Sequence, residues 1–139
     1  MVQFNFRPFK TQRLGLVYRP FATVTLRHES HFVMDDFIVD AGADLTMIPL
    51  WIGNTLRLSP PQRAEIVPIG GIGGFLPIVY RKVLLEIGNY RLEARIAWSQ
   101  SDETPLLLGR FDVFDFLKIT FDQTDRLTTF IRKQKASRK

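Results

Sequence analysis

The first candidate for chemistry is Asp40, which follows the apolar run Phe37-Ile38-Val39 and stands two positions before Gly42. The apolar run predicts a buried strand, and the glycine permits a sharp turn where the chain leaves it. A carboxylate at the end of a buried strand is partly desolvated and is therefore a candidate for acid–base chemistry. An aspartate that merely starts a turn by bonding its own backbone gives the same pattern, so on this segment alone both interpretations stay open.

A second candidate is the glycine-rich segment Ile69 to Phe75, which reads IGGIGGF. Four glycines give a backbone that adopts positive φ freely and that approaches a ligand closely. The flanks on both sides are strand-like, so the segment predicts a hairpin with a glycine tip, that is, a flap. A phosphate-binding loop is disfavoured because strand-like residues follow the run and no Lys or Ser/Thr stands in the required place.

The third candidate is Arg110, which follows the apolar triplet 106–108 and Gly109. The planar guanidinium of arginine can hold a carboxylate through two hydrogen bonds, and Asp44 is the candidate partner. The alternative is an exposed arginine that contributes little to stability.

Other polar residues do not make a second site. His28 and His31 flank Glu29 in a predicted hairpin turn, but a metal site needs three or four convergent ligands. The chain has no cysteine, and its serines lack a nucleophile elbow. The sequence therefore predicts no metal site, no cofactor and no serine hydrolase.

Short strands must position these residues. Alternating or β-branched runs predict strands at 21–27, 32–39, 65–69, 75–87 and 90–98, with shorter extended pieces at 46–49, 106–108, 119–121 and 127–131. Residues 50–56 are expected to form a helical turn or two. The run FDVFDFL at 111–117 predicts one short helix against a sheet.

Seven to nine short strands and a C-terminal helix indicate an all-β fold, a small closed barrel or sandwich of mostly antiparallel strands. Its 139 residues suit one domain, expected at 1–131, followed by a basic, disordered tail at 132–139. The net charge is +5 and much of the excess lies in that tail. A solvated end is favoured over a nucleic-acid contact there. No apolar run is long enough for a membrane span and no signal sequence opens the chain, so a cytoplasmic protein is expected.

Together the three motifs resemble those of the retroviral-type aspartic proteases, or retropepsins. Residues 40–44, DAGAD, resemble the family's Asp-Thr-Gly-Ala-Asp signature. Residues 69–75 are identical to the flap tip of the human immunodeficiency virus protease, a member of that family. Residues 106–110, LLLGR, resemble the apolar-apolar-Gly-Arg segment before the family's single helix. Order and spacing agree from about residue 20 to residue 131, and Tyr18-Arg19-Pro20 is more similar to cellular, bacterial-type members.

The resemblance implies an acid protease fold with one lobe per chain and an endopeptidase that cleaves between apolar residues. The chain has one Asp-x-Gly, so two chains must each supply Asp40 in a homodimer. By similarity, Ala41, Gly42, Ala43 and Asp44 complete the active-site loop, and Asp44 pairs with Arg110. The remaining substrate-binding positions implied by the resemblance are Ile38, Met47, Ile69, Gly70, Gly71, Ile72, Pro105 and Leu107.

Ala41 departs from the family pattern, where a Thr or Ser stands. That hydroxyl bonds across the dimer axis in the family, and alanine cannot replace it. Reduced activity is expected, and a module that dimerises or binds peptides without cleaving them is the alternative function.

Overall fold

The structure is a computed structural model that describes residues 1–71 and 74–133. Its first long hairpin joins β4 (Phe21–His28) to β5 (His31–Val39) across the turn Glu29-Ser30. Alternate residues of β4 are buried because one face of the strand packs on the core. The same alternation in the sequence predicted both strands and their turn, and the structure confirms them.

A second hairpin joins β8 (Gly74–Ile87) to β9 (Tyr90–Ser99), and Gly88 at its turn has a φ of 60°. The first half of β8 also pairs with β7 (Val67–Gly71), which makes the predicted flap. Between these hairpins lie β6 (Thr46–Ile48), the helix α1 (Leu50–Thr55) and the 3₁₀ turn Arg63–Glu65.

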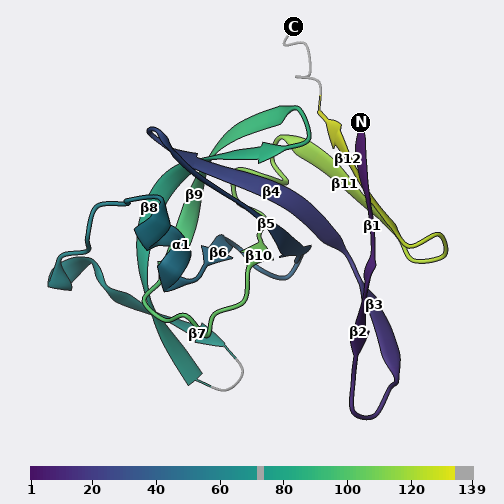
Figure 1. Cartoon of the computed structure of the whole chain (residues 1–139), viewed down its shortest axis with the longest axis horizontal. Coiled ribbons are helices and arrows are strands. Elements are labelled where there is room, and N and C mark those ends of the chain that lie inside the picture. Colours follow the sequence, from purple (N-terminus) through teal and green to yellow (C-terminus); the bar gives the residue numbers. More distant parts are fainter. Residues whose placement is uncertain (72–73, 134–139) are drawn as a thin grey trace, which may run out of the picture.

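Six strands close the barrel, in the order β4-β5-β10-β6-β9-β8, and the pairing of β4 with β8 completes the circle (Figure 1). The short β10 (Leu107–Leu108) lies between β5 and β6; it runs parallel to β5 and antiparallel to β6. A further parallel pairing joins β6 to β9. The predicted closed all-β barrel is therefore confirmed, and the parallel pairs bring the strands that precede Asp40 and follow Pro105 side by side.

The core fills the barrel interior with aliphatic and aromatic side chains, and α1 packs against it through Ile52. Gly53 of α1 is needed for this contact, because a Cβ atom there would lie 2.0 Å from the indole of Trp98. The Trp98 indole is buried and donates from Nε1 to the carbonyl of Leu50 at 3.2 Å. The contacts of Leu50 and Gly53 with Trp98 therefore hold α1 against β9 of the barrel.

The described residues contain twelve strands, more than the seven to nine that the sequence predicts. The three additional ones precede the barrel: β1 (Val2–Asn5), β2 (Arg7–Lys10) and β3 (Leu16–Arg19). β1 joins the predicted C-terminal hairpin of β11 (Leu117–Asp122) and β12 (Leu127–Arg132) in a three-stranded sheet of order β1-β12-β11. β2 and β3 form a separate two-stranded hairpin.

The helix predicted over residues 111–117 is wrong: residues 111–116 form consecutive turns and Leu117 begins β11. Asp112 has a φ of 64°, which a helix does not allow, and its amide donates to the Asp115 carboxylate at 2.9 Å. The short helix of this chain is α1 instead. No helix within the described ranges is long and apolar enough to cross a membrane. The predicted tail lies outside the described residues from position 134 onward.

Candidate active site

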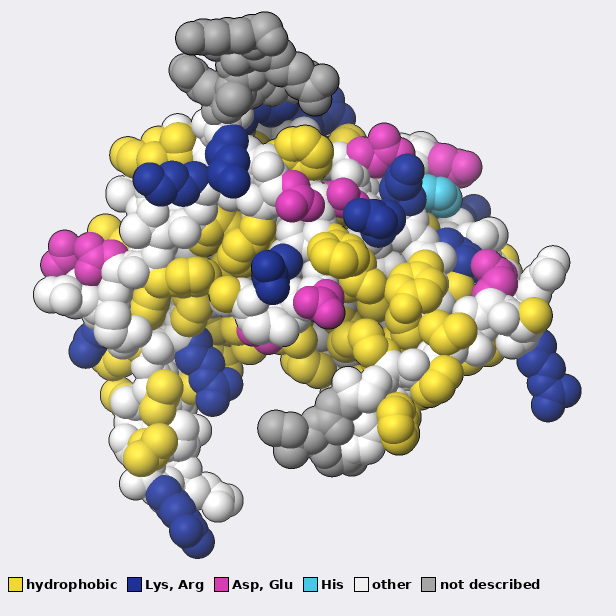
Figure 2. Space-filling view, turned by 180° about the vertical axis from the view of Figure 1, so that it is seen from behind, with side chains coloured by type: hydrophobic (Ala, Val, Ile, Leu, Met, Phe, Trp, Pro, Cys, Tyr) yellow, Lys and Arg dark blue, Asp and Glu magenta, His cyan; other side chains and the backbone are white. Residues whose placement is uncertain are grey.

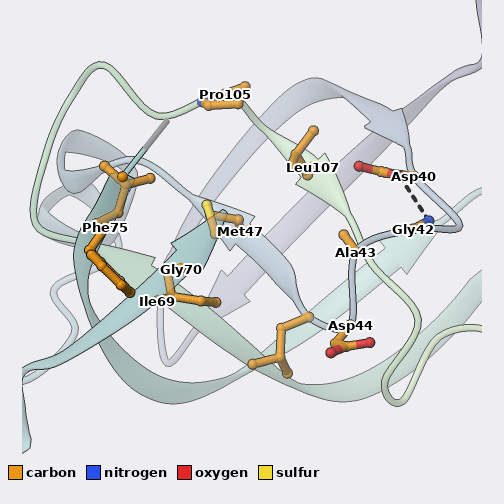
Figure 3. Close-up of a pocket in the computed structure, with 13 residues that line it drawn as sticks. Asp40, Gly42, Ala43, Asp44, Met47, Ile69, Gly70, Phe75, Pro105 and Leu107 are labelled. Carbon is orange, nitrogen blue, oxygen red and sulfur yellow. Dashed lines mark hydrogen bonds between the residues drawn. The ribbon is translucent and has the colours of Figure 1, made fainter. Parts of the chain in front are cut away.

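Asp40 stands at the end of β5, where the chain turns out of the barrel. Its amide donates to the carbonyl of Leu108 at 3.0 Å, so β10 holds the backbone of Asp40 from the side. Its Oδ1 accepts a hydrogen bond from the amide of Gly42 at 2.9 Å (Figure 3), and its carbonyl accepts one from the amide of Ala43 at 3.2 Å. The carboxylate therefore does start a turn, and this turn also fixes its direction.

Two glycines permit this geometry. A Cβ atom at Gly42 would lie 3.2 Å from the Asp40 Oδ1, which is closer than most side-chain contacts. At Gly109 a Cβ atom would lie 2.2 Å from the carbonyl carbon of Leu45, so only glycine fits. The Gly109 amide donates to the buried hydroxyl of Thr46 at 3.0 Å. The glycine of the LLLGR motif thus allows that segment to pack directly behind residues 40–45.

The backbone, and not an ion pair, joins Asp44 to Arg110. The Arg110 amide donates to the Ala43 carbonyl at 2.9 Å, and the Phe111 amide donates to the Asp44 carbonyl at 2.8 Å. Both side chains are exposed, and the salt bridges found between described residues do not include the predicted one from Asp44 to Arg110. The side-chain ion pair that the resemblance implies between Asp44 and Arg110 is not formed in the single chain.

A salt bridge does tether the segment that follows. Arg95 on β9 donates from Nε to the Asp112 carboxylate at 2.9 Å and also from its amide at 3.0 Å. The hydrogen bond from the Arg95 side chain holds the pKa of Asp112 below its ordinary value, against the effect of partial burial. This contact attaches the turns after Arg110 to the barrel wall.

The flap faces the Asp40 loop. Its strands pair Ile69 with Leu76 and Gly70 with Phe75. A Cβ atom at Gly70 would lie 2.9 Å from the ring of Phe75, so the ring occupies the space that the glycine leaves open. The side chain of Phe75 is 76% exposed.

A cavity of about 630 Å³ lies between the flap and the Asp40 loop (Figure 3). Nine of the predicted site residues line it: Asp40, Gly42, Ala43, Asp44, Met47, Ile69, Gly70, Pro105 and Leu107. Leu45, Gly74, Phe75 and Leu76 also line it and were not predicted as site residues. Strand alternation after the glycine run is the signal that could have indicated Leu76, which pairs with Ile69.

Within the described part of the chain, Ile38, Ala41 and Arg110 are predicted site residues that do not line the cavity. Ile38 lies on β5 between the buried Phe37 and Val39, and so points to the other face of the strand. Ala41 is exposed and directly follows Asp40 in the loop, and Gly71 is the last residue of β7. Ile72 lies outside the described residues. Roles for Ile38, Ala41 and Gly71 against a partner chain or a substrate stay predictions.

The histidines lie away from this cavity. His28 Nδ1 is 2.9 Å from the carbonyl of Leu56, which links the end of β4 to the segment after α1. Among the described residues, no group of three or more His, Asp or Glu side chains is placed to hold a metal ion. The chemistry that the cavity offers is that of carboxylates beside apolar walls.

Comparison with solved structures agrees with this architecture. The chain is similar to the EIAV protease complexed with the inhibitor HBY-793, with a TM-score of 0.51 and 23% sequence identity over 72% of this chain and 88% of that chain. No protein-family model matches the chain, and no curated protein matches it. The likeness defines the fold, which is retropepsin-like.

Proposed function

We propose that this protein is an aspartic endopeptidase that works as a homodimer, with one Asp40 from each chain. The observation that carries the proposal is the position of Asp40, at the floor of an apolar cavity that lies opposite a hairpin flap. The backbone turn to Gly42 orients the carboxylate before any substrate arrives.

A second chain is required by the chemistry. Peptide hydrolysis by carboxylates uses one ionised group to activate a water and one protonated group to polarise the carbonyl. Asp44 also lines the cavity, but in Figure 3 its carboxylate lies apart from that of Asp40. Two Asp40 side chains that meet across a two-fold axis supply both roles.

The substrate is proposed to be an extended peptide with bulky apolar residues at the cleaved bond. The cavity walls are formed by Met47, Ile69, Leu76, Phe75 and Leu107. An extended peptide can add to the exposed backbone of the flap as a further strand, and apolar side chains can fill the cavity. Burial of those side chains provides the binding energy.

The test is cleavage of a mixed peptide library at several pH values between about pH 4 and pH 7, which gives the pH dependence expected of acid–base catalysis. The wild-type chain is compared with Asp40→Asn and with the matched control Asp125→Asn, which changes an exposed aspartate in the β11–β12 turn. Cleavage by the wild type and the control, but not by Asp40→Asn, is expected. Equal cleavage by all three chains would contradict the proposal.

The second candidate is a module that dimerises or binds peptides without cleaving them, and Ala41 favours it. Ala41 is exposed next to Asp40 and has no hydroxyl with which to brace a partner's loop. Ala41→Thr would add about 1 kcal/mol for each of two symmetric hydrogen bonds, so dimer affinity should rise by about tenfold to thirtyfold. Sedimentation measures that change. If Ala41→Thr dimerises and still cleaves nothing, the non-catalytic module is the better description.

A further inference from the structure

The β2–β3 hairpin projects from the body of the molecule (Figure 1). Within the described ranges it pairs with no other strand, and two strands alone are only marginally stable in water. Its tip is nevertheless well formed: the Thr11 amide donates to the Gly15 carbonyl at 2.8 Å, and the Leu14 amide donates to the Thr11 hydroxyl at 2.9 Å. Leu14 and Leu16 are 79% and 59% exposed. An ordered tip that presents leucines to solvent indicates a contact surface.

The hairpin is rooted beside the candidate active site. The carbonyl of Pro20, which follows β3, accepts a hydrogen bond from the amide of Val39, the residue before Asp40. Phe9 stacks on Phe21 with ring centroids 5.4 Å apart, and Arg7 pairs with Asp36 at 2.6 Å. The hairpin therefore joins the barrel at the same end as Asp40, where β5 finishes and β4 begins.

This position matters for a dimer. Two Asp40 side chains can meet only if the partner approaches this end of the barrel, so the inference rests on the proposed homodimer. Four strand residues span about 13 Å, and the tip extends beyond them. A partner seated at the Asp40 end comes within reach of the hairpin.

The distribution of charge along the sequence favours a second copy of this chain as the partner that contacts the hairpin. Residues 1–20 carry four basic and no acidic side chains, whereas residues 21–131 carry ten basic and fourteen acidic ones, a net charge of −4. Figure 2 shows the hairpin as a separate projection with a basic side chain at its end. Lys10 and Arg13 form no salt bridge with any residue in the described part of the chain. The barrel of another copy offers charge of the opposite sign.

We propose that the β2–β3 hairpin is an arm that clasps the barrel of a second copy of this chain. Leu14 and Leu16 supply the apolar contact, and Lys10 and Arg13 face the acidic barrel of the partner. In a symmetric dimer the two arms make this contact twice, so each change in the arm counts twice.

Cross-linking tests where the arm lies. The chain has no cysteine, so Leu14→Cys provides one attachment point for a photoreactive maleimide. The matched control is Arg63→Cys, an exposed residue in the 3₁₀ turn before the flap. Irradiation is expected to give a product of twice the chain mass from Leu14→Cys and not from Arg63→Cys. Equal yields from the two positions, or no product from either, would overturn the proposal.

Sedimentation tests what the arm contributes. All chains carry Asp40→Asn, so that affinity is measured without cleavage, and the arm variants are Leu14→Asp and Arg13→Glu. The dimer dissociation constant is expected to rise by about tenfold or more for Leu14→Asp, and the effect of Arg13→Glu should shrink at high salt. Arg63→Glu is the charge control, and an unchanged thermal unfolding profile shows that the barrel remains intact.

The outcomes separate this inference from the proposed function. Arm variants that dimerise as tightly as the parent chain overturn the arm, even if Asp40-dependent cleavage is observed. A tight, arm-dependent dimer that cleaves nothing supports the arm and contradicts the protease. A chain that stays monomeric at every concentration overturns the arm. If the variants instead lose affinity for a single-stranded oligonucleotide while the dimer is unchanged, the arm is a polyanion contact and the proposal is wrong.

Discussion

The cavity has a floor and a roof that are built in opposite ways. On the floor, residues 40–45 are held by β5, β10 and the segment at Gly109. This packing is so close that a Cβ atom at Gly109 would lie only 2.2 Å from the backbone of Leu45. On the roof, the flap strands β7 and β8 pair with each other at this end, and the atoms nearest to a Cβ at Gly70 belong to the exposed ring of Phe75. The floor can therefore hold a reacting group in place, whereas the roof can adjust to a substrate. Glycine substitutions on the two sides should separate stability from activity.

The largest effect is expected for Gly109→Ala. The new methyl group meets the backbone of Leu45, which cannot rotate away, so the loop behind Asp40 must move. Overpacking of this kind costs about 1–3 kcal/mol and occasionally more, and we expect the upper end. Urea unfolding gives the loss of stability. A stability equal to wild type would mean that the floor is not rigid.

Gly53→Ala should cost somewhat less. Its methyl group meets the buried indole of Trp98 at 2.0 Å and would disturb the hydrogen bond to Leu50. A side chain can shift where backbone cannot, so about 2 kcal/mol is expected. Tryptophan fluorescence during unfolding reports both the stability and the change around the indole, although Trp51 contributes a second signal. An unchanged emission maximum would argue against the proposed clash.

Asp112→Asn tests the tether between β9 and the turns behind the floor. The pKa of Asp112 is lowered in the folded chain, so the stabilisation is present above its ordinary value of 3.8 and is lost as the pH falls below it. The variant should therefore be slightly less stable than wild type at pH 6, and the difference should shrink as the pH falls below 3.8. Thermal unfolding across that range provides the measurement. A constant difference across that range would assign the effect to packing and not to charge.

The smallest change in stability is expected for Gly70→Ala on the roof. The ring of Phe75 is exposed and can rotate away from the new methyl group, so the free energy of unfolding should change by less than about 0.5 kcal/mol. The catalytic rate should fall severalfold, because the added methyl group lies beside the cavity and would hinder the close approach of the substrate to the flap backbone. A fall in stability as large as that of Gly109→Ala would remove the distinction between floor and roof.

The barrel, and most of the candidate residues that line the cavity, could be predicted from the sequence because both depend on local patterns. Alternation in 21–27 and 90–98 requires strands, and the glycines at 42 and 70–74 mark the loop and the flap. The segment 111–117 was predicted wrongly because its apolar spacing suits a helix. Instead, Asp112 is held in a turn by two hydrogen bonds: the Arg95 amide donates to the Asp112 carboxylate, and the Asp112 amide donates to the Asp115 carboxylate. Contacts with a distant strand overrode the local preference.

The N-terminal strands were missed for a related reason. β1 is short, and its partner is β12 at the other end of the chain. In β2 a proline and two basic residues weaken the strand pattern. The ion pair implied between Asp44 and Arg110 is absent from the single chain for a different reason: backbone hydrogen bonds join the two segments, and both side chains are exposed.

The pairing of β1 with β12 has a consequence for the order of folding. Val2 lies opposite Phe130, so the first strand of the chain finds its partner only after the last strand has been synthesised. Closing so long a loop costs entropy, and non-local pairings of this kind slow folding. The barrel strands from 21 to 99 can form earlier, through hairpins whose turns are short. β11 and β12 can likewise form early as a hairpin, so β1 should be the last strand to join its sheet.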